Sequence, residues 1–445
     1  MRGRLEAQPE LGTVTALTHE GAGIVRDGKA AFVPGALPGE SIRFRRTRRR
    51  KQHDEGTLLD VLSASAERVA PRCAHFGVCG GCVLQHLSPE AQLLAKQTEL
   101  RDNLERVARV TPAEWLAPLR GPVWEYRRRA RLGARFVTRK GRVVVGFRER
   151  SAPYVADVQR CEVLAPPVGA LIAPLAAMLS ELSVRDQIPQ IEVAVADDAV
   201  ALVLRVLQHP SAADRERLLQ FERAQGVQLY LQPGGLESVQ PLSAAAALLS
   251  YALPEFDLRL QFAPTDFIQI NRTVNEALVA RAVQLLGLSA DSVVLDLFSG
   301  IGNFTLALAR HAAQVVGVEG ELALVERARH NARHNRIDNA QFHLADLAQP
   351  PTPGSAWLSR TYTHVLLDPP RAGAAAMLRT IAQLRATRLL YISCHPGSLA
   401  RDVGALVHEH GMAVRAAGVL DMFPHTTHVE SLVLLETQAH AERRP

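Results

Sequence analysis

The chain has 445 residues, of which 47% are hydrophobic and 22% are charged. Because a single core stops growing at about 250–300 residues, we expect two or three domains, and the ordinary composition excludes disorder for most of the chain. The longest uncharged apolar stretch, residues 163–180, contains three prolines and is short for a membrane-spanning helix. No secretory signal is visible at the start, so we expect a cytoplasmic protein.

Positive charge is unevenly distributed along the chain. Lysine and arginine total 51 against 45 aspartate and glutamate residues, a formal net charge of +6. Seven of the nine residues from 43 to 51 are basic, and residues 121–160 hold eleven basic against three acidic side chains. One such cluster could be a solvated surface, but two together favour a polyanion, most often nucleic acid. We expect these arginines, those at 127–129 among them, to hold nucleic-acid phosphates.

Three kinds of secondary-structure pattern follow one another. Residues 11–63 predict short strands that form an OB-type barrel, a frequent oligonucleotide binder, or another small β-domain. A polar helix capped by Ser88 is expected to about residue 110. Residues 121–255 are mixed α/β, with strand-like runs ARLGARFV, RVVVGFRE, QIEVAVA and AVALVLRVL. From about residue 262, strands alternate with helices, which predicts a doubly wound, mainly parallel sheet; its strands are VVLDLF, QVVGVEG, AQFHLAD, HVLLDPP, RLLYISC, MAVRAAGVLDM and HVESLVLLET.

The first strand of that sheet leads into a glycine-rich turn, D-x-F-x-G-x-G, which starts at Asp296. The next strands end at Glu319, suited to bind both hydroxyls of a ribose, and at Asp346, placed to border an adenine. Dinucleotide-binding folds usually carry a third glycine in G-x-G-x-x-G, which is missing here. We therefore predict S-adenosylmethionine rather than NAD as the cofactor.

Three later segments carry reactive side chains at the ends of predicted strands. Asp368-Pro-Pro alone resembles the motif of amino-group methyltransferases, which need no cysteine, whereas Cys394 and Glu430 suit methylation at carbon 5 of a pyrimidine. That carbon becomes nucleophilic only after a thiolate adds to carbon 6, and a base must then remove its proton. We expect Cys394 as nucleophile, with a pKa lowered near His395 and Arg371, and Glu430 as base. An inert buried thiol and a strand-end carboxylate are the alternatives.

Two amide side chains precede this region in the segment FIQIN. Gln269 and Asn271 are two residues apart, so in an extended segment they point the same way. Their amides could orient a base or the cofactor, or they could cap the following helix.

Three of the five cysteines, Cys73, Cys79 and Cys82, are spaced as C-x5-C-x2-C, and Cys161 is more distant. Four thiolates can hold zinc or an iron–sulfur cluster. Zinc ribbons usually pair two C-x2-C knuckles, so one three-cysteine loop with a distant fourth ligand favours a four-iron cluster. Zinc remains the alternative occupant.

These motifs resemble the RNA uracil-C5 methyltransferases that make 5-methyluridine, in particular the bacterial subgroup that acts on 23S ribosomal RNA. The resemblance covers nearly the whole chain and is carried by HFGVCGGCVLQH, YRRRARL, DFIQIN, DLFSGIGNF, VVGVEG, LLDPPRAG and DMFPHTTHVES. It implies a multi-domain fold: an OB-like TRAM barrel (residues 1–66), a central α/β domain with a 4Fe–4S cluster (67–87 and 120–260), and a Rossmann-like methyltransferase domain (88–119 and 261–445).

The resemblance also implies roles for single residues. Cys394 would be the nucleophile and Glu430 the base. The cluster ligands would be Cys73, Cys79, Cys82 and Cys161. The cofactor and target base would be bound by Gln269, Phe298, Asn303, Glu319, Asp346 and Asp368. We expect a monomer that acts on 23S ribosomal RNA and does not bind a membrane.

The sequence departs from the family at two positions. His395 follows the nucleophile where the family usually has asparagine, and Ser299 stands where a cysteine is common. The effect of His395 on the thiol is open at this point. Two other functions remain: an exocyclic amino-group methyltransferase of nucleic acid, which would not need Cys394, and a non-catalytic RNA-binding assembly factor.

Overall fold

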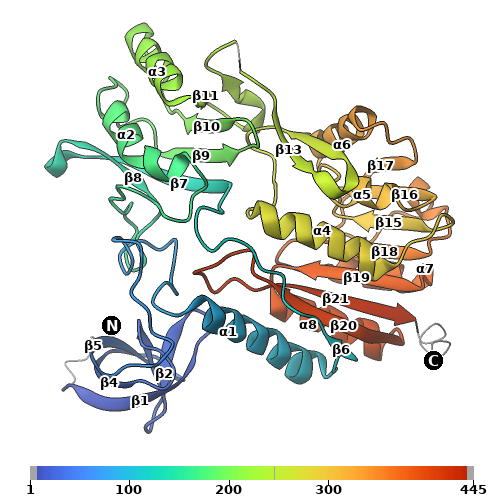
Figure 1. Cartoon of the computed structure of the whole chain (residues 1–445), viewed down its shortest axis with the longest axis horizontal. Coiled ribbons are helices and arrows are strands. Elements are labelled where there is room, and N and C mark those ends of the chain that lie inside the picture. Colours follow the sequence, from blue (N-terminus) through green and yellow to red (C-terminus); the bar gives the residue numbers. More distant parts are fainter. Residues whose placement is uncertain (1–7, 245, 438–445) are drawn as a thin grey trace.

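The computed structural model describes residues 8–244 and 246–437. Figure 1 shows the N-terminal barrel at one corner, a six-stranded sheet beside it, and an eight-stranded sheet that contains the C-terminal half of the chain. In the described part of the chain, no helix is long and apolar enough to cross a bilayer.

The barrel is closed, with strand order β1-β2-β3-β5-β4. Its strands are β1 (Glu10–Leu17), β2 (Ala22–Val25), β3 (Ala31–Pro34), β4 (Ser41–Arg49) and β5 (Asp54–Ser63). Alternate residues point inward and form a small core that includes Val14, Val33, Ile42 and Phe44. The expected five-stranded barrel is confirmed.

The second sheet has the order β12-β11-β10-β9-β7-β8. Its strands are β7 (Arg129–Val137), β8 (Arg142–Gly146), β9 (Gln190–Val195), β10 (Val200–Arg205), β11 (Gln228–Gln232) and β12 (Gln240–Pro241). Helices α2 (Val168–Ser180) and α3 (Ala212–Gln225) share a core with its inward-facing residues. The four strand-like runs expected between residues 121 and 255 all form strands.

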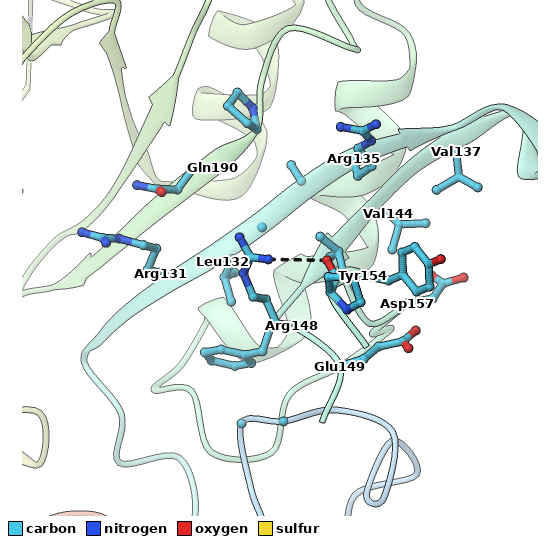
Figure 2. Close-up of a pocket in the computed structure, with 18 of the residues that line it drawn as sticks. Arg131, Leu132, Arg135, Val137, Val144, Arg148, Glu149, Tyr154, Asp157 and Gln190 are labelled. Atoms are coloured by element: carbon cyan, nitrogen blue, oxygen red, sulfur yellow. Dashed lines mark hydrogen bonds between the residues drawn. The ribbon is translucent and has the colours of Figure 1, made fainter. Parts of the chain in front are cut away.

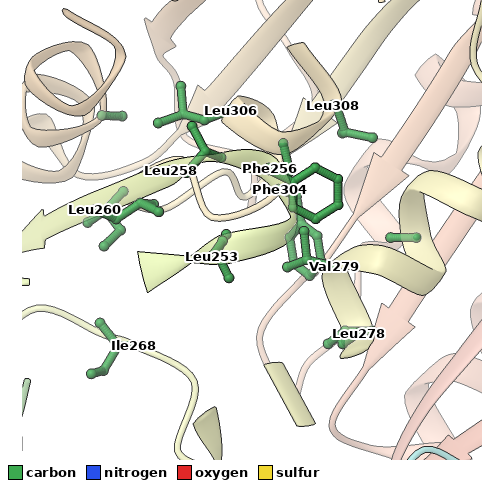
Figure 3. Packing of buried hydrophobic residues seen from close by; sticks show 14 of the residues in the cluster. Leu253, Phe256, Leu258, Leu260, Ile268, Leu278, Val279, Phe304, Leu306 and Leu308 are labelled. Atoms are coloured by element: carbon green, nitrogen blue, oxygen red, sulfur yellow. The ribbon is translucent and has the colours of Figure 1, made fainter. Parts of the chain in front are cut away.

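A hairpin of β13 (Leu249–Leu253) and β14 (Leu258–Phe262) lies between the two larger sheets. Its apolar residues pack with the helices of the C-terminal sheet, and Figure 3 shows Leu253, Leu258 and Leu260 near Val279 and Phe304. The hairpin therefore shares the core of the eight-stranded sheet.

The third sheet has the order β17-β16-β15-β18-β19-β21-β20-β6. Its strands are β6 (Glu114–Trp115), β15 (Val293–Leu297), β16 (Gln314–Glu319), β17 (Ala340–Leu344), β18 (His364–Leu367), β19 (Arg388–Ser393), β20 (Met412–Leu420) and β21 (Glu430–Thr437). The strands from β17 to β19 are parallel, and β21 is inserted antiparallel between β19 and β20. All seven expected strands are confirmed; β6 was not expected.

Helices cover both faces of this sheet, as the strand–helix alternation predicts. Residues alternate between the two faces along β15, with Val294 in one core and Leu295 in the other. One face is covered by α4 (Arg272–Leu286), α5 (Thr305–Ala309) and α6 (Leu322–His334). The other is covered by α1 (Pro89–Asp102), α7 (Leu378–Leu384) and α8 (Pro396–His408).

Helix α1 connects the N-terminal segments to this sheet. The Ser88 side chain accepts a hydrogen bond from Ala91 N at 3.2 Å, as expected for its cap. The helix continues in a wider, π-type turn over Asn103–Ala108. Its buried stripe of Leu93, Lys96, Leu100 and Leu104 faces the sheet.

Candidate active site and cysteine pocket

The turn after β15 has the backbone geometry of a ligand-binding loop. Gly300 (φ 54°) and Gly302 (φ 93°) adopt the left-handed conformation that glycine allows, and so does Phe298 (φ 66°). A non-glycine residue in this region is strained, and such strain gathers at functional sites. Gly300 N donates to Glu319 Oε2 at 2.9 Å, so the turn is held against the end of β16.

Two acidic residues expected to contact the cofactor, Glu319 and Asp346, lie at the ends of neighbouring strands. Glu319 ends β16, where its Oε1 accepts from Gly320 N at 2.7 Å. Asp346 follows β17, is exposed, and accepts from Ala348 N at 2.9 Å. Because β15, β16 and β17 are parallel neighbours, the structure brings the glycine-rich turn, Glu319 and Asp346 to one edge of the sheet. We call this edge, where β15–β19 end, the reaction edge.

Two carboxyl groups lie deeper at the reaction edge. Loss of solvation, together with the nearby carboxylates of Asp368 and Glu319, raises the pKa of Asp296 to about 7. Asp296 is fully buried; Thr305 Oγ1 donates to its Oδ2, and its Oδ1 has no hydrogen-bond partner among the described residues. Asp368 retains some exposure, yet desolvation raises its pKa to about 7 as well.

The amide side chains occupy different places. Gln269 Nε2 donates to Asp368 Oδ2 at 3.3 Å, which places Gln269 at the reaction edge. Asn271 instead caps α4, with its Oδ1 accepting from Val274 N at 3.4 Å. Asn303 Oδ1 accepts from the hydroxyl of Tyr251 at 2.9 Å, and its Nδ2 donates to Asn275 Oδ1 at 3.0 Å, so the side chain is fixed.

Cys394 and Glu430 stand at the same end of two paired strands. Strands β19 and β21 are antiparallel, and their last register partners at this end are Ser393 and Ser431. Cys394 directly follows Ser393 and Glu430 directly precedes Ser431, so the register brings the thiol and the carboxyl together. Glu430 is 9% exposed. Burial and, to a smaller extent, the nearby Asp368 raise its pKa to about 8 against the opposing effect of Lys96.

The thiol is not activated in the way the sequence suggested. Burial, together with the nearby Glu430 and Asp368, raises the pKa of Cys394 to about 11, and Arg371 opposes this rise only in part. The expected lowering of this pKa is therefore wrong, although Arg371 acts in the expected direction. Desolvation and two neighbouring carboxyls outweigh one guanidinium.

His395 has a structural role that explains why it does not activate the thiol. Its Nδ1 accepts from Ser398 N at 3.1 Å, so the side chain caps α8. Burial lowers the pKa of His395, and Arg371, His19 and Arg401 lower it further. The imidazole is thus neutral near pH 7 and adds no positive charge beside Cys394. Asparagine, the usual family residue, is also a favoured cap.

Two residues of α1 that sequence reasoning missed hold the segment before Glu430. Lys96, 2% exposed, donates to Asp421 Oδ1 at 2.8 Å and to the Phe423 carbonyl at 2.9 Å. Gln92 Oε1 accepts from His425 N at 2.7 Å. The signal was present in the sequence, because Lys96 occupies an apolar position in the spacing Leu93, Lys96, Leu100.

The four cysteines predicted as ligands line one pocket. Cys73, Cys79, Cys82 and Cys161 surround it with Phe147 and Gln85, and all four are free thiols. Burial raises the pKa of Cys79 to about 11 and that of Cys82 to about 12, so unpaired thiolates would be costly here. Residue type and shared location fit a thiolate-bound metal group. Among the described residues, however, no group of three or more potential ligands is already arranged to hold a metal ion.

The arginines at 127–129 contact protein rather than solvent. Arg128 is 6% exposed and pairs with Asp197 at 2.8 Å. Arg129 pairs with Glu192 at 3.8 Å and hydrogen-bonds the Pro264 carbonyl. The guanidinium of Arg127 lies 5.2 Å from the Phe147 ring centroid, beside the cysteine pocket. The expectation that these three residues hold RNA phosphates is therefore wrong for Arg128 and Arg129, because internal partners use their donors.

The barrel cluster is also largely ion-paired. Four arginines of residues 43–51 pair with acidic residues of the barrel: Arg43, Arg46, Arg48 and Arg50. Arg45 and Arg49 are exposed and make no ion pair within residues 8–244 and 246–437. These two remain available to a polyanion.

The fold and site together define a Rossmann-like methyltransferase. A family model described as "Methyltransferase domain" matches residues 288–356, and one described as "tRNA (Uracil-5-)-methyltransferase" matches residues 356–438. A solved structure, Pyrococcus abyssi tRNA (uracil-54, C5)-methyltransferase in complex with S-adenosyl-L-homocysteine, shares the fold with a TM-score of 0.74 at 22% identity, covering 96% of this chain and 99% of that chain.

Curated relatives match over almost the full length. A protein of Xanthomonas campestris pv. campestris (strain 8004) named 23S rRNA (uracil(1939)-C(5))-methyltransferase RlmD is 48% identical over 439 residues, or 98% of this chain and 99% of the relative. A Nitrosococcus oceani protein of the same name is 49% identical over 440 residues, covering 98% of each. The chain belongs to the RNA uracil-C5 methyltransferase family, in the bacterial subgroup whose members are named RlmD.

Proposed function

We propose that this protein transfers a methyl group from S-adenosylmethionine to carbon 5 of a uridine in 23S ribosomal RNA. The observation that carries the proposal is the place of Cys394 and Glu430 next to the register partners Ser393 and Ser431, at the same edge of the sheet as the glycine-rich turn. The names of the relatives from Xanthomonas and Nitrosococcus support the substrate, position 1939 included.

The cofactor is assigned to the edge formed by β15, β16, β17 and β18. Glu319, at the end of β16, is suited to the ribose hydroxyls, and the exposed Asp346 to the adenine. The turn at Phe298 passes close to the ligand, and Asn303 supports that turn through Asn275 and Tyr251. Gln269 and Asp368, joined at 3.3 Å, lie toward the reacting groups.

The reaction is assigned to Cys394 and Glu430. The Cys394 thiol gives its proton to solvent and its sulfur adds to carbon 6, which moves the ring electrons to carbon 5. Carbon 5 then takes the methyl group as its bond to the sulfonium sulfur breaks, and the neutral thioether S-adenosylhomocysteine is the leaving group. Glu430 removes the carbon-5 proton, and the bond from sulfur to carbon 6 breaks to restore the ring.

The pKa values of the two groups fit these roles. A pKa of about 11 keeps the Cys394 thiol protonated near pH 7, and a positive sulfonium bound at the same edge favours its ionised form. Glu430, with a pKa of about 8, is well matched to proton transfer near neutral pH. The base must leave the RNA stack to reach these groups.

The metal site is assigned to Cys73, Cys79, Cys82 and Cys161 as ligands of a 4Fe–4S cluster. The shared pocket and the four thiols support this assignment. A bound cluster would supply cross-links within a segment that has few regular hydrogen bonds. Absorption spectroscopy after anaerobic purification tests this assignment. A 4Fe–4S protein should absorb at about 400 nm, and a colourless zinc protein would contradict the assignment.

The remaining assignments concern domains and location. We assign residues 1–66 to a TRAM domain, residues 67–87 and 120–260 to the central domain, and residues 88–119 and 261–445 to the methyltransferase domain. A ribosomal RNA substrate is consistent with a cytoplasmic location. The expectation of a monomer stays a prediction.

The decisive experiment is mass spectrometry of the protein after incubation with S-adenosylmethionine and a 23S rRNA fragment that contains 5-fluorouridine. Fluorine does not leave as a proton does, so a methylated RNA adduct mapped to Cys394 is expected. Methylation of ordinary RNA without any adduct would overturn carbon-5 chemistry in favour of the amino-group alternative. RNA binding without methylation would favour the assembly-factor alternative.

A further inference from the structure

A basic groove lies on the central sheet, apart from the reaction edge. Its volume is about 1110 Å³, and it runs along the solvent-facing side of the β7–β8 hairpin (Figure 2). The loop of residues 147–157 and the glycines Gly80 and Gly81 complete its wall. The residues assigned to the cofactor and to the reaction do not line it.

The charge of the groove is positive and only partly neutralised. Five basic side chains and two acidic ones line it: Arg131, Arg135, Lys140, Arg148, Arg150, Glu149 and Asp157. Lys140 pairs with Asp157 at 2.5 Å, and Arg131 pairs with Glu192 at 2.8 Å. Within the part of the chain that the structure describes, Arg135, Arg148 and Arg150 make no ion pair. Arg148 donates one hydrogen bond to the Pro153 carbonyl at 3.4 Å and Arg150 is half-buried, whereas Arg135 is exposed. The charges of all three guanidinium groups are therefore unpaired by carboxylates of the described residues and available to an anion.

An aromatic side chain stands beside these charges. Tyr154 is 67% exposed, although a tyrosine ring is usually at least half-covered in a folded protein. Figure 2 shows Tyr154 and Arg148, from the loop of residues 147–157, beside the hairpin strands that carry Val144 and Arg135. An exposed ring next to guanidinium groups is the combination on which single-stranded bases stack while their phosphates are neutralised.

The groove is built rigidly enough to select a ligand. Arg135 is paired with Val144 in the hairpin register. The loop is closed by hydrogen bonds from Glu149 N to Tyr154 O at 2.9 Å and from Ala156 N to Phe147 O at 2.8 Å. Gly133 lets this loop approach β7, since a Cβ there would lie 2.7 Å from Val155 Cγ2. A preformed site loses less entropy on binding than a mobile one.

We propose that this groove binds a single-stranded segment of the RNA substrate, at a distance from the methylated base. Arg135, Arg148 and Arg150 hold its phosphates, and Tyr154 stacks with one of its bases. A duplex would keep its bases stacked on each other and leave Tyr154 without a role. The inference rests on the proposed function only in taking RNA as the ligand.

The test measures RNA affinity of the full-length protein without methyl transfer. Equilibrium binding of a 23S rRNA fragment, and of a short unstructured oligouridylate, is compared for Arg135→Glu, Tyr154→Ala and Tyr154→Phe. Arg217→Glu is the matched control, because Arg217 is exposed on α3 and makes no ion pair in the described residues. Circular dichroism confirms that each variant is folded.

We expect Tyr154→Ala to weaken binding of both RNAs by at least about fivefold, the effect of one lost stacked base, while Tyr154→Phe binds as wild type does. Arg135→Glu should weaken binding and reduce the slope of log affinity against log salt by about 0.7. Unchanged affinities relative to Arg217→Glu would overturn the proposal. If Arg135→Glu weakened RNA binding while Tyr154→Ala bound as wild type does, the groove would not be a site for single-stranded RNA.

The outcome is separable from that of the proposed function. Methyl transfer by the wild-type protein is measured on the same RNA fragment. If transfer is absent, the proposed function fails while the affinity comparison still reports on the groove. If transfer is present and the variants bind like the control, only the groove assignment fails.

Discussion

The reaction edge and the cysteine loop (residues 73–87) are organised by different means. At the reaction edge, strand register decides where each side chain stands: Cys394 and Glu430 meet because Ser393 and Ser431 are partners. The cysteine loop contains no helix and no strand beyond single bridges. Its position depends on individual hydrogen bonds, such as those from Val83 N and Leu84 N to the His425 carbonyl. Strand register thus fixes the reaction edge, whereas single contacts fix the cysteine loop.

The two regions are nevertheless in direct contact. Val83 N and Leu84 N both donate to the carbonyl of His425, at 2.9 and 3.0 Å. His425 belongs to the segment that leads into Glu430 and that α1 holds through Gln92 and Lys96. On its other side, the loop bonds the groove hairpin through Gly80 N to Arg148 O at 2.8 Å. The cysteine loop therefore bridges the catalytic segment and the basic groove.

The largest expected effect distinguishes the proposed nucleophile, Cys394, from a proposed cluster ligand, Cys79. Cys394→Ala should reduce methyl transfer by about 10³-fold or more, because no other group can add to carbon 6, and leave the midpoint of thermal unfolding nearly unchanged. Cys79→Ala should instead lower that midpoint. Single-turnover transfer and calorimetry on both variants make the comparison. Substantial activity of Cys394→Ala would contradict the nucleophile assignment.

The next effect concerns the base. Glu430→Gln should lower turnover by about 10²–10⁴-fold, since a neutral amide cannot take the carbon-5 proton. The earlier steps need only the thiol, so a methylated RNA adduct should accumulate on Cys394 and be visible on a denaturing gel. The double variant with Cys394→Ala is the control and should form none. A slow Glu430→Gln protein without adduct would place Glu430 before methyl transfer.

Removing the proposed cluster tests the dependence of the loop on its ligand. After chelation under reducing conditions, we expect faster amide hydrogen exchange in residues 78–84 and 147–150, whose hydrogen bonds depend on the loop. The barrel strands β1–β5, which have their own core, serve as the internal control. Equal exchange before and after iron loss would show that the loop holds its shape without a ligand.

The contrast between these regions also explains what could be predicted from the sequence. The seven strands follow from periodicity, and the place of the glycine-rich turn follows from the rule that parallel strands present their ends at one edge. The meeting of Cys394 with Glu430 depends on the antiparallel pairing of β19 with β21, which the sequence pattern alone does not give. Two further features could not be predicted in this way: the burial of Arg128 and Arg129, and the raised pKa of Cys394. They depend on contacts between segments distant in sequence, such as Asp197 with Arg128 or Asp368 with Cys394. Lys96 was recognisable only as a charge within an apolar stripe.

A smaller effect follows from the buried carboxyl of Asp368. Its pKa is raised to about 7 from a reference of 3.8, so the folded state keeps a proton that the unfolded state loses over this range. Stability contributed by the neutral form is present below about pH 4 and is lost as the pH rises to about 7. Asp368→Asn should therefore stabilise the protein relative to wild type, by about 1–3 kcal/mol more at pH 7 than at pH 4, reduced by solvent at the open edge.

Denaturant unfolding at several pH values measures this difference, in the absence of cofactor. Asp338→Asn is a suitable control, because Asp338 lies outside the reaction edge, between α6 and β17. A constant difference between Asp368→Asn and wild type from pH 4 to pH 7 would show that Asp368 is solvated well enough to ionise normally.

The smallest effect is expected at His395, one of the two positions where the sequence departs from the family pattern. If the residue acts as the cap of α8, His395→Asn retains the hydrogen bond to Ser398 N and should keep stability and methyl transfer within about twofold. His395→Ala removes the cap and should cost about 1 kcal/mol of unfolding free energy. Because α8 begins two residues after Cys394, loosening its first turn also displaces the thiol and lowers kcat more than it raises KM for RNA. Retained activity in both variants would show that the β19–β21 register alone positions Cys394, and a loss in His395→Asn would assign the imidazole a role beyond capping.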